Sequence, residues 1–384
     1  MPAPRFPRVV ALALTGFLAV TPTARSAAHP VDPPRSVRFL GEAVVPNGLV
    51  FAGTTVGGLS GVDRDPRTGG YVFISDDRSN TGPARFYTAA FTVGVNGVGP
   101  VAFTGTRPLL TPSGRTYPPL SADDPSLPMN ERTVDPEDLR VDPLTGAYAW
   151  SQEGERTATV TIDPSIRVAD RAGRHLRDLP IPRNERMAPG TGPRQNLALE
   201  GLTFAAAGTL LVSAVEAPLV QDGPESTTEH GSLSRVTVQS RSGRILAQYA
   251  YPQEPVFAAP NPPGALATTG VPAVLAVDRL DPTRFLVLER AFVTGVGNKV
   301  RIFEFDTRGA TNVLTVDSLA GAPVRPVRKR LVADLADFPL SRVDNIEGMT
   351  WGPPLPTGER TLVLVSDNNF SASQITQVVA LAVR

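Results

Sequence analysis

The sequence contains no cysteine among its 384 residues. This absence excludes a disulfide framework and thiolate chemistry, so the fold must rely on a large core, a bound metal or both. Histidine is almost absent as well, because only His29, His175 and His230 occur and the last two lie in polar segments. A Ser-His-Asp triad is therefore not expected.

The sequence also lacks an excess of charge of either sign. Its 37 basic and 37 acidic residues give a formal net charge of zero, so nothing favours a nucleic-acid partner or an anionic membrane surface. Lysine is represented only by Lys299 and Lys329. Any anion-binding site must therefore be built mainly from arginine.

The first 28 residues have the pattern of an export signal. Arg5 and Arg8 supply a basic region, residues 9–20 an apolar core, and the small residues "SAA" at 26–28 a cleavage site before His29. The apolar core is too short to span a membrane, and no later segment reaches 18 apolar residues. We predict a signal peptide over residues 1–28 and a secreted or periplasmic domain over residues 29–384, not attached to a membrane.

One sequence pattern is repeated five times along the chain, at residues 58–77, 136–153, 199–216, 273–290 and 344–370. Each copy places an acidic or small residue before an apolar strand, a turn and a β-rich strand, and most end on an acid. The turns "DPRTG" (65–69) and "DPLTG" (142–146) carry proline and glycine where a tight turn needs them. Each copy therefore predicts a β-hairpin.

Further strand-like runs follow the hairpins, which gives four antiparallel strands per unit and predicts an all-β protein with the blades of a β-propeller. We count five blades, with room for a sixth in the first interval. The last unit is one strand short, so residues 36–45 are expected to pair with residues 374–383 and close the ring. A β-sandwich is the alternative, but it does not explain the regular recurrence.

The acids of the repeat are expected to meet at one mouth of the propeller. The start of the first strand and the end of the second lie at the same edge of a hairpin, and the separation is 16 residues in most copies. Asp344, Asn345 and Asn369 lie beside these positions. The ten equivalent positions carry eight carboxylates: Asp76, Glu137, Glu153, Glu200, Glu216, Glu289, Glu347 and Asp367.

Clustered carboxylates need a compensating cation or raised pKa values. Oxygen ligands without cysteine and with few histidines suit Ca²⁺ rather than Zn²⁺, so we predict that these eight acids bind calcium. Arg78, Arg194 and Arg290 lie near them in sequence and are predicted to bind an anionic substrate. Alternatively, the acids accept backbone hydrogen bonds at strand ends, and the arginines are surface charges or salt-bridge partners.

Two segments carry a resemblance to a known family. The segment "NLALEGLTFAAAGTLLVSAVEAPL" (196–219), together with "DNIEGMTW" and "LVLVSDNNF", resembles the phytase-like family with "esterase-like activity of phytase". The resemblance covers roughly residues 36–384 and implies a β-propeller distantly similar to calcium-dependent propeller phytases. It implies a secreted, metal-assisted phosphoric-ester hydrolase. Its motif falls on Asn196, Glu200, Glu216, Glu347, Asp367 and Asn368.

The resulting hypothesis is a monomeric hydrolase of a small-molecule ester, phosphorylated in the first interpretation. Glu200 and Glu347 are the candidate catalytic residues, and Asn196 and Asn368 the candidate polar contacts to substrate. The second copy departs from the family pattern, with Glu137-Asp138 in place of Glu-Gly. Two alternatives stay open: a non-catalytic propeller that binds a ligand or partner, and a sugar-lactonase-like hydrolase with one Ca²⁺ held by Glu and Asn.

Overall fold

The computed structural model describes Met1, Pro2 and residues 36–384. The predicted signal peptide falls almost wholly outside these residues. The chain divides into units 1–34 and 35–384, and the second contains all of the secondary structure described below.

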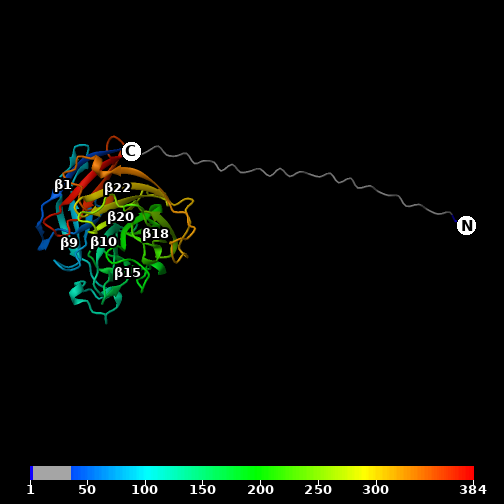
Figure 1. Ribbon diagram of the computed structural model, residues 1–384. Helices are drawn as coiled ribbons and strands as arrows, with labels where there is room; N and C mark the ends of the chain where they lie inside the picture. The colour runs from blue at the N-terminus through cyan, green and yellow to red at the C-terminus, as the bar shows by residue number, and fades with distance from the viewer. Residues whose placement is uncertain (3–35) are drawn as a thin grey trace. The chain divides into compact units, whose positions relative to one another are not determined.

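Residues 36–384 form five four-stranded antiparallel sheets, the blades of a propeller (Figure 1). Blade one contains β4 (Leu59–Arg64), β5 (Tyr71–Ser75), β6 (Arg85–Ala90) and β9 (Ala102–Pro108). Blade two contains β10 (Pro136–Val141), β11 (Tyr148–Gln152), β14 (Ser165–Ala169) and β15 (His175–Leu179). Blade three contains β16 (Leu199–Ala205), β17 (Leu210–Val215), β18 (Leu233–Ser240) and β19 (Ile245–Pro252).

Blade four contains β20 (Ala267–Ala276), β21 (Arg284–Val293), β22 (Gly297–Asp306) and β23 (Arg328–Asp334). Blade five contains β24 (Ile346–Trp351), β25 (Arg360–Ser366), β26 (Thr376–Val383) and β1 (Val37–Val45). β1 is antiparallel to β26, with Val37 opposite Val383 and Val45 opposite Thr376. The predicted pairing of the two chain ends is confirmed.

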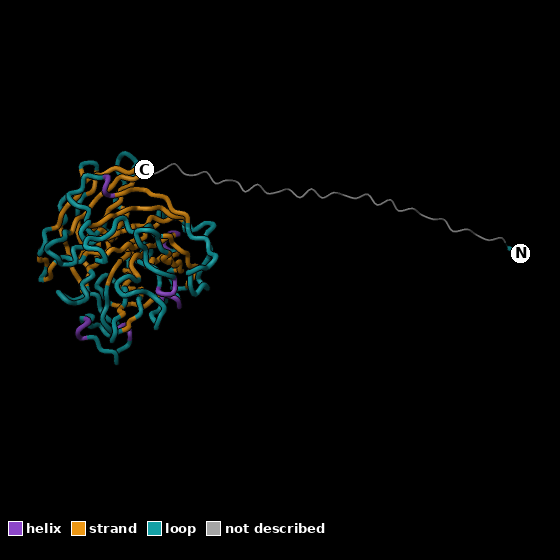
Figure 2. Tube along the Cα trace, in the orientation of Figure 1, coloured by secondary structure: helices purple, strands orange, loops and turns teal. Residues whose placement is uncertain are grey.

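The remaining elements are short (Figure 2). Three two-stranded ribbons lie outside the blades: β2 (Val50–Phe51) with β3 (Thr54–Thr55), β7 (Val93–Gly94) with β8 (Gly97–Val98), and β12 (Glu155–Arg156) with β13 (Thr161–Ile162). The 3₁₀ turns are η1 (Leu120–Ala122), η2 (Met129–Glu131), η3 (Arg183–Glu185), η4 (Ala206–Gly208), η5 (Val220–Asp222) and η6 (Leu335–Asp337). The first interval thus holds a ribbon and 3₁₀ turns, and the described chain has five blades rather than six.

Among the described residues, no helix has the length and apolar character needed to cross a membrane.

The core consists of apolar clusters between neighbouring blades. Leu288 of blade four packs in one cluster with Met349 and Leu364 of blade five. Similar clusters join blades one and two, two and three, three and four, and five and one. Because each blade buries its apolar faces against two neighbours, the ring needs all five blades to cover its core.

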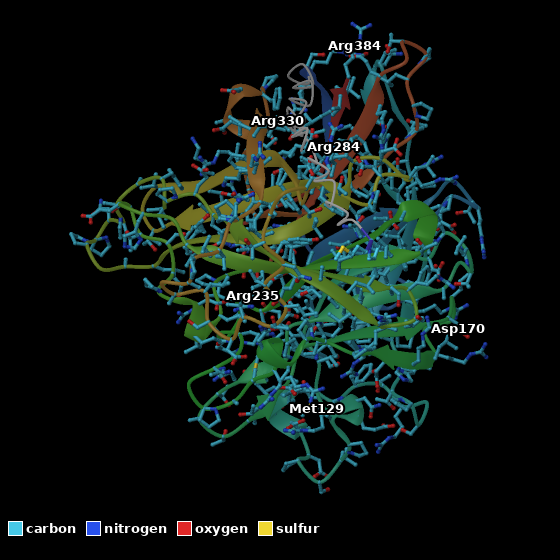
Figure 3. The ribbon with its side chains drawn as sticks, turned by 90° about the vertical axis from the view of Figure 1, so that its right-hand side faces the viewer. Met129, Asp170, Arg235, Arg284, Arg330 and Arg384 are labelled. Atoms are coloured by element: carbon cyan, nitrogen blue, oxygen red, sulfur yellow. The ribbon has the colours of Figure 1, made fainter. Side chains whose placement is uncertain are left out.

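Several arginines form ion pairs within the fold, among them Arg235, Arg284 and Arg330, which Figure 3 labels. Arg235 is fully buried and donates to both carboxylate oxygens of Asp222, at 2.6 and 2.7 Å. Arg284 and Arg330 both bind Glu304. An arginine beside an acid is therefore no evidence of an anion site here unless its guanidinium faces a cavity.

The buried Arg140 connects the inner strands of several blades through hydrogen bonds. Arg140 donates to the carbonyl oxygens of Val62 in blade one, at 3.1 Å, and Met349 in blade five, at 2.9 Å. It also forms a pair with Asp138 at 2.7 Å, and the same carboxylate accepts the Leu202 N–H of blade three at 2.8 Å. Asp138 thus stands where three of the other four copies carry glycine, because it is the partner of Arg140.

We expect Arg140→Leu to lower the free energy of unfolding by about 3–5 kcal/mol, since it leaves the Asp138 carboxylate buried without its cation. Denaturant unfolding followed by tryptophan fluorescence measures the change. The double variant Arg140→Leu with Asp138→Asn removes the unpaired charge and should recover part of the loss. An unfolding curve for Arg140→Leu that superimposes on the wild-type curve would contradict this role.

Candidate active site

Glu-Gly pairs at the start of the inner strands, Glu200-Gly201 and Glu347-Gly348, place acids at the propeller axis. In blade three the register shifts between Leu199 and Leu202, so Glu200 lies in a bulge at the start of the inner strand. A Cβ on Gly201 would lie 2.7 Å from the backbone nitrogen of Val274 in the next blade. The glycine therefore lets the next inner strand pass close by, while the glutamate in the bulge turns into the axial space.

The acids line a cavity of about 420 Å³ at the mouth of the propeller. Six of the eight predicted acids contribute to its lining: Asp76, Glu137, Glu200, Glu216, Glu347 and Asp367. A seventh, Glu153, is buried beside them. The structure therefore brings together seven of the eight acids that the repeat singled out.

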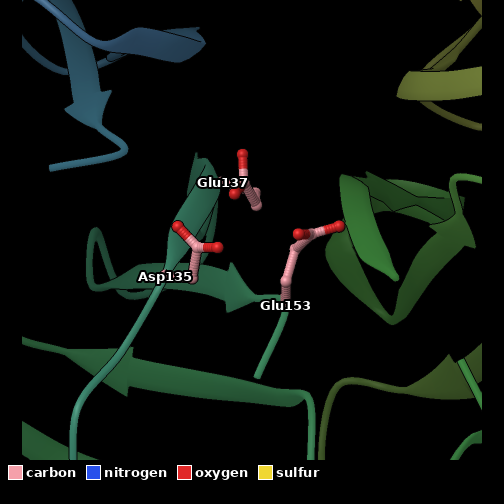
Figure 4. Close-up of side chains that lie close together, drawn as sticks. All are labelled: Asp135, Glu137 and Glu153. Atoms are coloured by element: carbon pink, nitrogen blue, oxygen red, sulfur yellow. The ribbon is translucent and has the colours of Figure 1, made fainter. Parts of the chain in front are cut away.

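Two groups of three carboxylates lie close enough to share a cation. Oxygens of Asp135, Glu137 and Glu153 all lie within 4.8 Å of one another, and so do oxygens of Glu153, Glu200 and Glu216. Figure 4 shows the first group, with its carboxylates around a common space. All five side chains are buried, and Glu153 belongs to both groups. These acidic clusters could hold a metal ion.

Burial raises the pKa of these carboxyls, and their neighbours' charges raise most of them further. The pKa of Glu153 rises to about 8, through burial and then the charge of Asp135. Burial raises the pKa of Asp135 and of Glu216 to about 7, although Arg78 and Arg290 oppose the shifts. The pKa is also raised, with burial the largest cause, at Asp76, Glu137, Glu200, Glu347 and Asp367. Burial therefore favours the neutral form of these carboxyls, and a cation in the cavity would favour the ionised form.

Two of the three predicted anion-binding arginines face this cavity. Arg290 donates to Glu347 at 2.9 Å and to Glu216 at 3.2 Å, and so bridges blades three and five. Arg78 lines the cavity and pairs with Asp135. The third, Arg194, instead donates to the carbonyl oxygens of Pro218 and Gly223 and holds a loop outside the cavity lining.

Glu289 does not join the acid cluster, contrary to the sequence alignment of the repeats. Its carboxylate accepts from the Tyr251 hydroxyl at 2.7 Å and from Lys329 at 2.5 Å. The register of blade four puts Gly270 opposite Arg290 just before the bulge, so the position of Glu200 is filled by Val271. The predicted alignment of the fourth copy was wrong by two residues, and Arg290 faces the cavity in place of Glu289.

One of the two predicted asparagines, Asn368, also differs from the sequence expectation. Asn368 is turned toward blade one, where its side-chain oxygen accepts the Gly58 N–H at 3.0 Å. Its side-chain nitrogen donates to Asn47, also at 3.0 Å, so Asn368 is not among the residues that line the acidic cavity. Asn196 and Asn369 do line it, both with left-handed φ angles of 55° and 46°.

Asp135 is the residue of the site that sequence reasoning missed. It precedes the second hairpin and stands two residues before Glu137. Residues two apart in an extended segment point to the same side, so the spacing of the two acids was the available signal.

Comparison with known families agrees with this architecture. Residues 54–370 match the family described as "Phytase-like: Esterase-like activity of phytase". The chain belongs to the phytase-like family. The matched range contains every acid of the cavity, so the clustered carboxylates are part of the phytase-like region of this chain. No curated protein matches it at a significant level.

Solved structures similar to this phytase-like protein are remote. An exo-β-1,3-galactanase from Phanerochaete chrysosporium has a TM-score of 0.42 at 9% identity, covering 90% of this chain and 64% of that chain. A gluconolactonase from Xanthomonas campestris has a TM-score of 0.32 at 12% identity, covering 91% and 96%. A DUF4221 family member from Bacteroides vulgatus has a TM-score of 0.38 at 8% identity, covering 91% and 99%. At such scores, the chemistry of this cavity must be argued from its own residues.

Proposed function

We propose that this phytase-like protein is a calcium-dependent ester hydrolase that acts on phosphoric monoesters in the acidic cavity. The observation that carries the proposal is the pair of carboxylate groups sharing Glu153, with Arg78 and Arg290 beside them. If these acids only accepted backbone hydrogen bonds at strand ends, several of them would not need to be buried side by side with raised pKa values. A cation explains that arrangement.

The donor set fits Ca²⁺. Calcium takes six to eight oxygen ligands in a flexible geometry, whereas a zinc site would draw on histidine or cysteine. The cavity offers carboxylate oxygens, and no histidine is among its lining residues. The residues that would hold calcium are Asp135, Glu137, Glu153, Glu200 and Glu216, with Asp76, Glu347 and Asp367 at the same mouth. When bound, calcium would stabilise negative charge on the ester oxygens as a Lewis acid.

The protein's own groups supply substrate binding and proton transfer. Arg290 and Arg78 present guanidinium groups that can bind phosphoryl oxygens, and Asn196 and Asn369 offer neutral hydrogen-bonding groups. Glu347 lines both this cavity and the adjoining one, so it is placed to give a proton to the leaving alcohol. Glu200 belongs to one of the two acid groups and does not line the adjoining cavity, so it is placed to accept a proton from the attacking water.

A panel of phosphate monoesters, carboxylic esters and lactones, assayed with calcium and with chelator, tests the proposal. We expect hydrolysis of phosphate monoesters that is lost in chelator and restored by Ca²⁺. Turnover of lactones alone would favour a lactonase. Turnover that chelator leaves unchanged would overturn the metal dependence, and no turnover of any ester would favour a binding protein. Export and a monomeric state remain predictions.

A further inference from the structure

A second cavity of about 720 Å³ adjoins the acidic one. The two cavities share lining residues, including Asn196, Arg290 and Glu347. A ligand held at Arg290 can therefore extend directly from the acidic cavity into the larger one. The second cavity lies between blade four and blade five, because its other lining residues come from the ends of these blades.

Blade four builds one wall of this cavity by extending its strands. β20, β21 and β22 each have ten residues, and the pairing of β20 with β21 continues beyond the bulge at Val271 as far as Val293. Phe292 lies opposite Thr268 on one side and Asn298 on the other, so these three side chains form a row across the strands. All three line the cavity.

This wall carries apolar side chains beside a cationic group. Phe292 is two residues from Arg290 on the same strand, so the two side chains share a face at a spacing of about 7 Å. Leu266 and Val296, which are 61% and 53% exposed, also line the cavity. Neither these two residues nor Phe292 belongs to a hydrophobic core cluster. Large apolar side chains that support no core and gather on one wall of a cavity offer a contact for an apolar part of a ligand, although most of the other lining residues are polar.

The cation of the opposite wall is paired with an acid. Arg342 lines the cavity, but its guanidinium donates to Asp344 at 3.2 Å and to the Ser373 carbonyl oxygen at 2.6 Å. A second phosphate in this cavity would meet the apolar wall on one side and Asp344 near the other. The apolar side chains and Asp344 therefore favour an uncharged group over a second phosphate in this cavity.

We propose that the preferred substrate is a phosphoric monoester of an apolar alcohol, whose hydrocarbon part lies against Leu266, Phe292 and Val296. This inference rests on the proposed function, because it assigns the alcohol side of the ester to the second cavity and the phosphoryl group to Arg290. Hydrolysis breaks the phosphorus–oxygen bond, transfers the phosphoryl group to water and returns a proton to the leaving alcohol. The apolar side chains contact the substrate but not the reacting atoms. Their contribution is therefore expected in KM rather than in kcat.

The test compares cyclohexylmethyl phosphate with glycerol 3-phosphate, in the presence of Ca²⁺. Both are esters of primary alcohols, so they differ in polarity more than in leaving-group acidity. We expect wild-type kcat/KM to be at least about tenfold higher for cyclohexylmethyl phosphate. Phe292→Ser and Leu266→Ser should remove most of this preference by raising KM. The matched control is Leu280→Ser, because Leu280 is 66% exposed at the far end of the same hairpin.

Calorimetry with non-hydrolysable probes separates this inference from the proposed activity. Cyclohexylmethylphosphonate should bind about tenfold more tightly than 2,3-dihydroxypropylphosphonate in wild-type protein, and equally in Phe292→Ser. If the wild type shows this difference but hydrolyses neither ester, the apolar cavity stands and the proposed hydrolysis fails. Equal binding of the two probes overturns the inference, as does an equal loss of preference in Leu280→Ser.

Discussion

Glu200→Gln or Glu347→Gln is expected to lower calcium-dependent kcat/KM by about 100- to 10,000-fold while the propeller remains folded. Glutamine keeps the size of the side chain but removes the charge that binds calcium and the group that exchanges a proton. The two residues enter the cavity from different blades. Each variant should therefore lose hydrolysis without removing an apolar contact of the core.

Glu289→Gln is the matched control for these variants. Glu289 is as deeply buried as the cavity acids, but it pairs with Lys329 and Tyr251 instead of facing the cavity. It should lower Tm and leave the activity per folded molecule unchanged. Measurement of Tm and turnover on all three variants separates the roles. Full activity in folded Glu200→Gln would end the case for this cavity as the active site.

The metal-free protein is expected to lose stability as the pH rises from about 5 to about 8.5. Burial raises the folded-state pKa of Glu153 to about 8 and of Asp135 and Glu216 to about 7, well above their values in an unfolded chain. The folded state therefore binds more protons than the unfolded state across this range, so the free energy of unfolding falls with increasing pH. In chelator, Tm should fall by about 5 °C or more.

Calcium should reverse this trend, because it binds the ionised carboxylates of the folded state only. At 100 times the dissociation constant the gain in stability is about 2.7 kcal/mol. Thermal unfolding at pH 5, 7 and 8.5, with calcium and with chelator, measures both effects. The difference between the two conditions should be largest at pH 8.5. A Tm that calcium leaves unchanged at pH 8.5 would contradict a cation site in this cavity.

The five blades and most of the cavity acids could be predicted because both depend on local patterns. The turns at residues 65–69 and 142–146 form as expected, with Gly69 and Gly146 at positive φ and their N–H groups bonded to Asp65 and Asp142. Seven of the eight acids chosen by their place in the hairpin meet at one mouth. An acid at the open end of a hairpin always lies at the same edge of its blade. When the hairpin is repeated around a ring, these edges meet, so the acids come together.

The fourth copy could not be aligned from sequence because its hairpin is longer than the others. Because β20 and β21 are extended, the bulge lies at Val271. The apolar pattern of the sequence is equally compatible with a bulge two residues later, which is the register that the sequence alignment used. The direction of Asn368 was equally hidden, since it depends on Gly58 and Asn47, which are more than 300 positions distant. Contacts between distant segments determine the direction of such a side chain, and these contacts cannot be predicted from the sequence pattern of one hairpin.

The pairing of β1 with β26 has a consequence for the nascent chain. β1 is synthesised before blades one to four, whereas its partner β26 is synthesised after them. Until then β1 has no partner strand, and blades one and five cannot bury their shared apolar cluster. We therefore expect ring closure to follow the synthesis of β26, and chains that terminate before β26 to remain open, with an unpaired edge that favours aggregation.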